Sequence, residues 1–182
     1  PLPDLTRGQL EIALVVERNG RSFIDWLAVP DPLAKVEATR LQVPAYTIFK
    51  GGEGIALYEG RAYFTTKHDN RVWVYHTDTQ ELEVLYDIET SDSPILKGVD
   101  NVVITATGDV LIAEDGDDMQ IVVLTDEGSV APLLQVIGHE RSEITGPAFD
   151  PSYQRLYFSS QRGSLGESSG GITYEVSRSD LT

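Results

Sequence analysis

The chain has 182 residues, with 29 acidic and 14 basic side chains, a formal net charge of −15 and no cysteine. So acidic a chain offers no basic stripe for a nucleic-acid backbone, and without cysteine it has no disulfide, thiol nucleophile or cysteine-ligated zinc. No apolar run approaches the roughly 18 residues that would cross a bilayer as a helix.

The first 48 residues differ from the rest and predict a partial blade followed by a crossover segment. Two apolar runs flank Asn19-Gly20, a dipeptide typical of a tight β-hairpin turn. Further on, Asp31-Pro32 precedes a run of good helix formers. Because aspartate caps helices and proline suits their first turn, we expect a short helix over residues 33–40.

From Phe49 onward the chain repeats a pattern of four short strands. Phe64, Ile112 and Phe158 occupy equivalent places in successive units, about 47 residues apart. This period, with four strands in each unit, is typical of propeller blades. The fold class predicted is therefore an all-β propeller, with blades over about residues 49–90, 97–137 and 143–178.

Three blades are too few to close a ring, because propellers typically have about four to eight. The sequence also begins at Pro1 rather than methionine. We therefore expect a single domain that is a fragment of a longer chain, or one that closes against a second chain. Either arrangement would cover its open sheet edges.

Acidic residues stand at the start of the first strand of each unit, and two more end the second strand of the middle unit. In a propeller all these places lie at one rim, so the side chains are expected to converge and to repel one another unless cations lie between them. The sequence therefore predicts a site for a hard metal ion. The candidate ligands are Glu53, Asp100, Asn101, Glu114, Asp115 and Glu143.

Arg141 lies two residues before Glu143. Its planar guanidinium is suited to holding a phosphate, although it could equally pair with Glu140 or Glu143 in a turn. Later in the same unit the Gly/Ser-rich segment 162–171 predicts a flexible loop. It is either an ordinary surface loop or long enough to lie over the mouth of the channel.

Several segments together resemble the PhoX-type alkaline phosphatase family. The resemblance covers residues 10–176 and corresponds to the C-terminal half of the family's propeller. The motifs are Phe49-Lys-Gly-Gly-Glu-Gly-Ile, Tyr63-Phe-Thr-Thr-Lys, Val72-Trp-Val-Tyr, Val99-Asp-Asn-Val, Ile112-Ala-Glu-Asp-Gly and Ser142-Glu-Ile-Thr-Gly-Pro-Ala-Phe.

The resemblance implies a six-bladed, periplasmic or secreted propeller that hydrolyses phosphate monoesters with Ca²⁺ and Fe³⁺. It implies that Glu53 and Glu143 bridge metals, that Arg141 clamps the phosphate, and that the remaining candidates are further ligands. The family's iron site also uses a cysteine from its other half, whereas this chain has none. On its own the chain is therefore not expected to assemble the whole metal cluster.

Two other functions remain open at this stage. Calcium-dependent lactonases of the gluconolactonase type share such a propeller, and Glu53, Asn101 and Asp115 would serve as their calcium ligands without Arg141. A non-catalytic calcium-binding or scaffold propeller is the other possibility, since a fold does not determine its function.

Overall fold

The computed structural model describes residues 7–125 and 127–177. These residues form thirteen β-strands and two 3₁₀ turns, and they contain no helix with the length and apolar character needed to cross a membrane. The described chain divides into two compact units. One comprises the residues up to 48 together with 76–82, and the other comprises 49–75 and the residues from 83 onward.

The first unit is built on a hairpin of β1 (Glu11–Arg18) and β2 (Arg21–Ala28). Its turn residues Asn19 and Gly20 both have positive φ, at 53° and 77°. This backbone suits the twist of a two-residue hairpin, so the predicted turn is confirmed. Within the same unit β2 also pairs with the residues that begin β6, through the partners Phe23 and Glu81.

The predicted helix over residues 33–40 is wrong, because only η1 (Thr39–Leu41), a 3₁₀ turn, forms here. The carboxylate of Asp31 accepts hydrogen bonds from the backbone N–H groups of Leu33 and Lys35, as a cap would. However, Ala34 takes a left-handed φ of 51°, which an α-helix cannot continue through. The cap therefore closes a turn.

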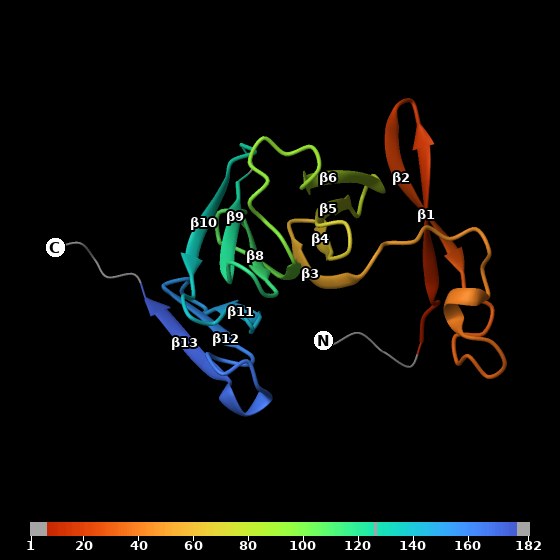
Figure 1. Ribbon diagram of the computed structural model, residues 1–182. Helices are drawn as coiled ribbons and strands as arrows, with labels where there is room; N and C mark the ends of the chain where they lie inside the picture. Colours follow the sequence, from red (N-terminus) through yellow and green to blue (C-terminus); the bar gives the residue numbers. More distant parts are fainter. Residues whose placement is uncertain (1–6, 126, 178–182) are drawn as a thin grey trace. The chain divides into compact units, whose positions relative to one another are not determined.

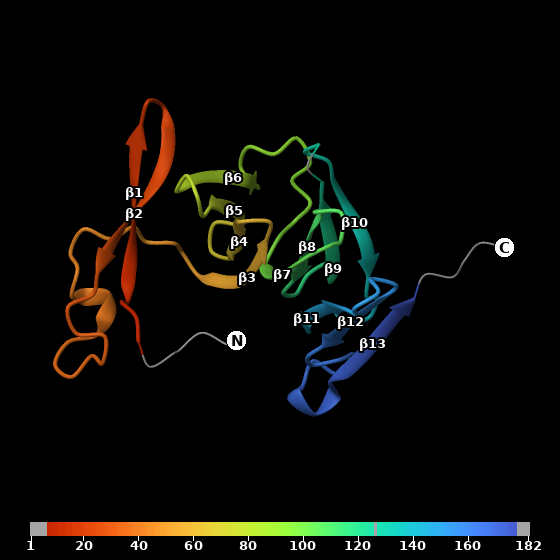
Figure 2. The same cartoon turned by 180° about the vertical axis from the view of Figure 1, so that it is seen from behind.

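The second unit contains three antiparallel sheets that follow one another along the chain (Figure 1). Each sheet begins with its innermost strand, and β7 lies beside both β3 and β11 (Figure 2). This confirms the all-β propeller fold. The first sheet contains β3 (Gly52–Tyr58), β4 (Arg61–Thr66), β5 (Arg71–His76) and β6 (Glu81–Asp87); the second contains β7 (Val99–Ile104), β8 (Val110–Glu114), β9 (Gln120–Leu124) and β10 (Val130–Gln135).

The third sheet has three strands within the described residues, in the order β11-β12-β13. They are β11 (Ile144–Phe149), β12 (Arg155–Ser160) and β13 (Ile172–Ser177). Between β12 and β13 lies the 3₁₀ turn η2 (Ser168–Gly170).

The middle sheet separates two apolar cores. Because side chains alternate across a strand, neighbouring residues of β8 serve opposite cores. Ile112 packs with Tyr63 and Val72 of the first sheet, whereas Leu111 packs with Phe158 of the third. All residues of β8 are buried as a result, so the end of this strand is a rigid support.

The innermost strands β3, β7 and β11 each have a register irregularity in their pairing with the following strand. The three irregularities lie at equivalent positions of the three blades, namely between Gly52 and Ile55, between Val99 and Val102, and between Thr145 and Ala148. A bulge of this kind turns side chains out of the normal alternation and is often found beside functional sites. In β7 the bulged residues are Asp100 and Asn101.

Candidate metal centre

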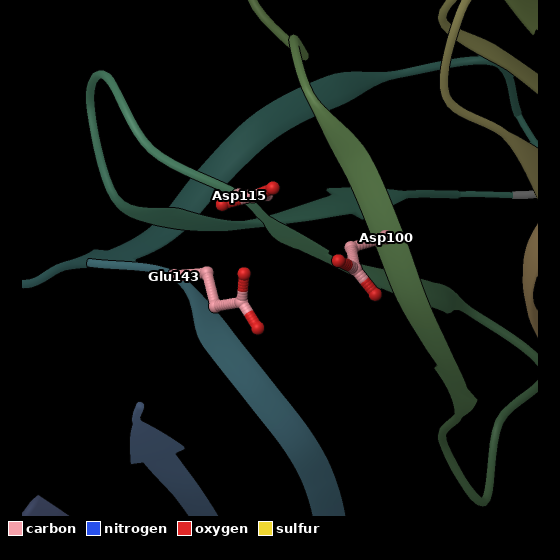
Figure 3. A group of neighbouring side chains, drawn as sticks. All are labelled: Asp100, Asp115 and Glu143. Atoms are coloured by element: carbon pink, nitrogen blue, oxygen red, sulfur yellow. The ribbon is translucent and has the colours of Figure 1, made fainter. Parts of the chain in front are cut away.

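Three carboxylates from different strand ends converge in the second unit, and we refer to Asp100, Asp115 and Glu143 as the acidic group. One ligand oxygen from each lies within 4.8 Å of the others, and all three residues are half-buried. In Figure 3 their side chains point toward one common space. Asp115 follows β8 and Glu143 precedes β11, and a β-bridge joins these two residues.

Contacts between the first and second sheets position Asp100. Thr65, which is buried on β4, donates a hydrogen bond of 2.6 Å to the carbonyl oxygen of Asp100. The same hydroxyl accepts a hydrogen bond from the N–H of Gly54. A Cβ on Gly54 would lie only 2.6 Å from the backbone nitrogen of Val102. The two innermost strands therefore meet closely enough here to require glycine.

Lys67 follows β4 and reaches the acidic group. Its Nζ donates a hydrogen bond to Asp115 Oδ2 and lies 3.8 Å from Asp100 Oδ2. This lysine supplies part of the positive charge that three converging carboxylates need.

Arg162 follows β12 and supplies the second positive charge. Nη1 donates to Glu143 Oε2 at 3.1 Å and Nη2 donates to Asp115 Oδ1 at 3.2 Å. Its Nε donates to the carbonyl oxygen of Arg141 at 2.9 Å. The planar guanidinium thus fastens two members of the acidic group and the turn before β11 to one point.

A network of buried polar side chains stabilises the turn before β11. The hydroxyl of Ser142 accepts hydrogen bonds from Ser160 Oγ and from the N–H of Arg162, both at 2.8 Å. Ser160 is also hydrogen-bonded to His139 Nδ1. All three side chains of the network are buried. Because buried polar groups are costly to leave unpaired, the network fixes the backbone on both sides of Arg141.

The pKa of Asp100 is raised to about 6, mainly by burial. The negative charge of Glu53 raises it further, Lys67 opposes this, and the rest of the acidic group raises it again. Asp100 therefore lies where the negative charge of this rim is least compensated, and a cation placed beside it would lower its pKa.

The pKa of Asp115 is lowered and that of Lys67 is raised. Burial alone would raise the pKa of Asp115, but its hydrogen bond to Lys67 and the charge of that lysine outweigh burial and lower the pKa. Burial would likewise lower the pKa of Lys67, yet the bond to Asp115 raises it. The two form an ion pair that stays charged at neutral pH.

Glu114 does not join the acidic group, contrary to the expectation that it faces the same way as Asp115. Its side chain is buried and accepts hydrogen bonds from the backbone N–H groups of Lys97 at 2.9 Å and Gln120 at 3.0 Å. Burial raises its pKa although both bonds oppose this. The reason is strand alternation, which turns consecutive residues to opposite sides.

Glu53 and Asn101 lie near the acidic group but are not members of it. Glu53 is exposed and affects Asp100 through its charge. The oxygen of Asn101 accepts hydrogen bonds from the N–H of Gly146 at 2.6 Å and from the hydroxyl of Thr145 at 3.2 Å, which join β7 to β11. Of the three ligands expected for a lactonase, Glu53, Asn101 and Asp115, only Asp115 belongs to the acidic group, although the amide nitrogen of Asn101 donates a hydrogen bond to Asp100 Oδ1 at 2.6 Å.

Arg141 is exposed, and its guanidinium donates a hydrogen bond to the carbonyl oxygen of Leu165 at 2.8 Å. It does not pair with Glu140 or Glu143 within the part of the chain that the structure describes. Since a guanidinium has five N–H donors, most of them remain available to an anion or to water.

The sequence analysis missed Lys67 and Arg162. Both follow the second strand of a blade, as Asp115 does, so the repeat that singled out the acidic residues carried the signal for these two as well. Their positive charge set them apart from the oxygen ligands that the hypothesis of a hard metal ion singles out.

The family model described as alkaline phosphatase PhoX matches residues 50–163, which include the acidic group, Lys67, Arg141 and Arg162. No curated protein matches the chain in sequence.

Several solved structures resemble the chain, and two of them are enzymes. A luciferin-regenerating enzyme is 14% identical with a TM-score of 0.53, over 96% of this chain and 80% of its own. A streptogramin B lyase is 19% identical with a TM-score of 0.49, over 74% of this chain. The match spans only 43% of that lyase chain. At such low identity the first likeness supports the fold alone.

Proposed function

Because the chain belongs to the alkaline phosphatase PhoX family, we propose that it serves the metal-dependent hydrolysis of phosphate monoesters, with the acidic group as a calcium site and Arg141 as the residue that holds the phosphate. The observation that carries the proposal is the convergence of three carboxylates, which hold two cationic side chains between them. A binding site for a divalent cation needs this concentration of negative charge.

The donor atoms of the acidic group fit calcium. Calcium takes oxygen ligands at about 2.3–2.6 Å, so two oxygens on one ion can be at most about 5.2 Å apart. The oxygens of Asp100, Asp115 and Glu143 lie within 4.8 Å of one another, so any two of them are close enough together to contact one ion. Carboxylate oxygens are also the ligands that calcium prefers.

The side chains around the ion have separate roles in this proposal. Arg141 donates hydrogen bonds to the phosphoryl oxygens, and Glu143 connects its turn to the metal. Lys67 and Arg162 balance the charge of the acidic group in the absence of a metal. A bound cation would supply electrostatic stabilisation of the charge that develops on the transferring oxygens.

Iron is not assigned to these residues. The family resemblance implies a cysteine ligand for Fe³⁺, and none of the 182 residues is cysteine. We propose that the complete activity needs further blades, from a longer chain or from a second chain, and that the closed propeller is periplasmic or secreted.

The test is chelation of the purified protein, with its metal content measured by elemental analysis. Binding of inorganic phosphate to the chain is followed before chelation, after it, and after calcium is returned, and hydrolysis of p-nitrophenyl phosphate is followed in the same way once the further blades are supplied. We expect both to be lost on chelation and restored by calcium.

R141A is expected to weaken phosphate binding strongly, to an affinity that is still measurable, and to leave calcium binding intact. R155A, at an exposed arginine that pairs with Glu175, is the control. Equal phosphate binding by metal-free and calcium-loaded protein would contradict the proposal. Lactone hydrolysis that persists in R141A would favour a lactonase, and calcium binding without any phosphate binding would favour a scaffold propeller.

A further inference from the structure

The loop between β12 and β13, residues 161–171, packs against the side chain of Arg141. Leu165 accepts the hydrogen bond from the Arg141 guanidinium through its carbonyl oxygen. At the start of the loop, the side chain of Arg162 donates to the Arg141 carbonyl oxygen. One loop thus holds both the backbone and the tip of the same arginine.

Gly166 lies against the side chain of Arg141, next to Leu165 in the loop. It has a left-handed φ of 69°, and a Cβ placed on it would lie 2.9 Å from Arg141 Cβ and 3.1 Å from Arg141 Nε. The nearest atom is the root of the arginine side chain, which cannot move without its backbone. A side chain at position 166 and the observed conformation of Arg141 therefore exclude each other.

The loop is closed on itself, in contrast to the flexible segment expected from its Gly/Ser composition. The N–H of Glu167 donates to the carbonyl oxygen of Arg162, and the N–H of Gly170 donates to that of Glu167. A Cβ on Gly163 would lie 1.9 Å from the carbonyl oxygen of Gly170. Glycine serves here to make a compact structure, because only glycine permits so close a backbone approach.

From these contacts we propose that the loop 161–171 orients the guanidinium of Arg141 toward its anionic ligand, and that Gly166 is the positioning residue. The proposal rests on the proposed function, because it takes a phosphate as that ligand. Gly166 acts only through Arg141. The loop removes conformational freedom that Arg141 would otherwise lose when the phosphate binds, which strengthens binding by preorganisation.

The experiment compares the whole chain with three variants, R141A, G166A and the double variant, using inorganic phosphate as the probe in the presence of calcium. G166A is expected to weaken phosphate binding about tenfold, on the order of one charge-assisted hydrogen bond. In the R141A background the G166A change is expected to have no further effect on phosphate affinity. A general structural defect would instead weaken both backgrounds, and that result would overturn the proposal.

A control variant and a second measurement distinguish failure of the positioning role from failure of the proposed function. G128A is the matched control, because Gly128 also has a positive φ of 82° but a Cβ there meets nothing within 4 Å. It should leave phosphate affinity unchanged. Fast-timescale order of the Arg141 Nε–H group is measured by ¹⁵N relaxation, with the resonance assigned by its loss in R141A.

The relaxation measurement does not require a ligand. We expect this group to be rigid in the wild type and in G128A and mobile in G166A. Unchanged order in G166A would overturn the positioning role. Order lost in G166A, combined with phosphate affinity unaffected by R141A, would instead reject the proposed function and leave the loop's hold on Arg141 standing.

Discussion

Glu114 and Asp115 are adjacent in sequence, but their side chains lie in different surroundings and are held by different kinds of donor. Glu114 is 2% exposed and is held by two backbone N–H groups. Asp115 is held by the side chains of Lys67 and Arg162. Backbone N–H groups are fixed in direction by the folded chain, whereas the side chains of Lys67 and Arg162 can rotate. Glu114 therefore has a structural role, whereas Asp115 can exchange its cationic partners for a metal ion.

The variant E114A tests the structural role of Glu114 and is expected to have the largest effect. The variant leaves the N–H groups of Lys97 and Gln120 without their acceptor and opens a cavity, so we expect the free energy of unfolding to fall by roughly 2–4 kcal/mol. Urea denaturation measures it. E114Q keeps one acceptor and should lose less. A change below about 0.5 kcal/mol, typical of surface sites, would mean that Glu114 has no such structural role.

The opposite outcome is expected from E143Q. Removing one of three carboxylate ligands should weaken calcium binding roughly a hundredfold, equivalent to about 2.7 kcal/mol, while stability changes little. Isothermal titration with calcium measures the affinity. D118N removes the same charge from an exposed turn residue and serves as the control. Equal losses in both variants would point to a general field effect.

Asp100 gives a pH signature in the metal-free protein. Its pKa is about 6 in the folded state against an ordinary value of 3.8 for aspartate, so the folded state binds more protons between these values. The stability contributed by the protonated carboxyl is present at low pH and is lost as pH rises through about 6. D100N should remove this dependence and, with screening allowed for, stabilise the protein at pH 7 by about 1 kcal/mol.

Thermal unfolding followed from pH 4 to pH 7 without metal checks this expectation. If the stability of the wild type depended on pH in the same way as that of D100N, the expectation would be contradicted. Addition of calcium should reduce the difference between the two proteins at pH 7 by neutralising Asp100 in the wild type.

The smallest expected effect concerns Lys67. K67M removes a cation that competes with a metal for Asp115, so calcium should bind a few-fold more tightly, consistent with about 0.5–1 kcal/mol for a partly exposed ion pair. The same calcium titration measures it, with K50M at an exposed lysine as the control. Weaker binding in K67M would show that the lysine organises the acidic group.

Much of the fold was predictable because repetition is written directly into the sequence. The equivalence of Phe64, Ile112 and Phe158 predicted the three blades, and Asn19-Gly20 predicted the first hairpin. The turn after Asp31, in place of the predicted helix, was not predictable from local preference alone, because the aspartate caps a turn as readily as a helix. Ala34 in the left-handed region decided the outcome.

The candidate site was predictable in part. The repeat placed Asp100, Asp115 and Glu143 at one rim, but it could not tell which of two consecutive acidic residues faces outward. That depends on the register of β8. The sequence also gave no sign that Gly166 packs on Arg141, because this contact joins two segments through a loop whose composition suggests flexibility.

The measurement that tests the central claim most directly is an anomalous difference map from crystals soaked in terbium, a substitute for calcium. The account predicts a peak about 2.3–2.6 Å from oxygens of Asp100, Asp115 and Glu143, with Lys67 turned away from Asp115. A map without a peak between these residues, with Lys67 still bound to Asp115, would contradict it.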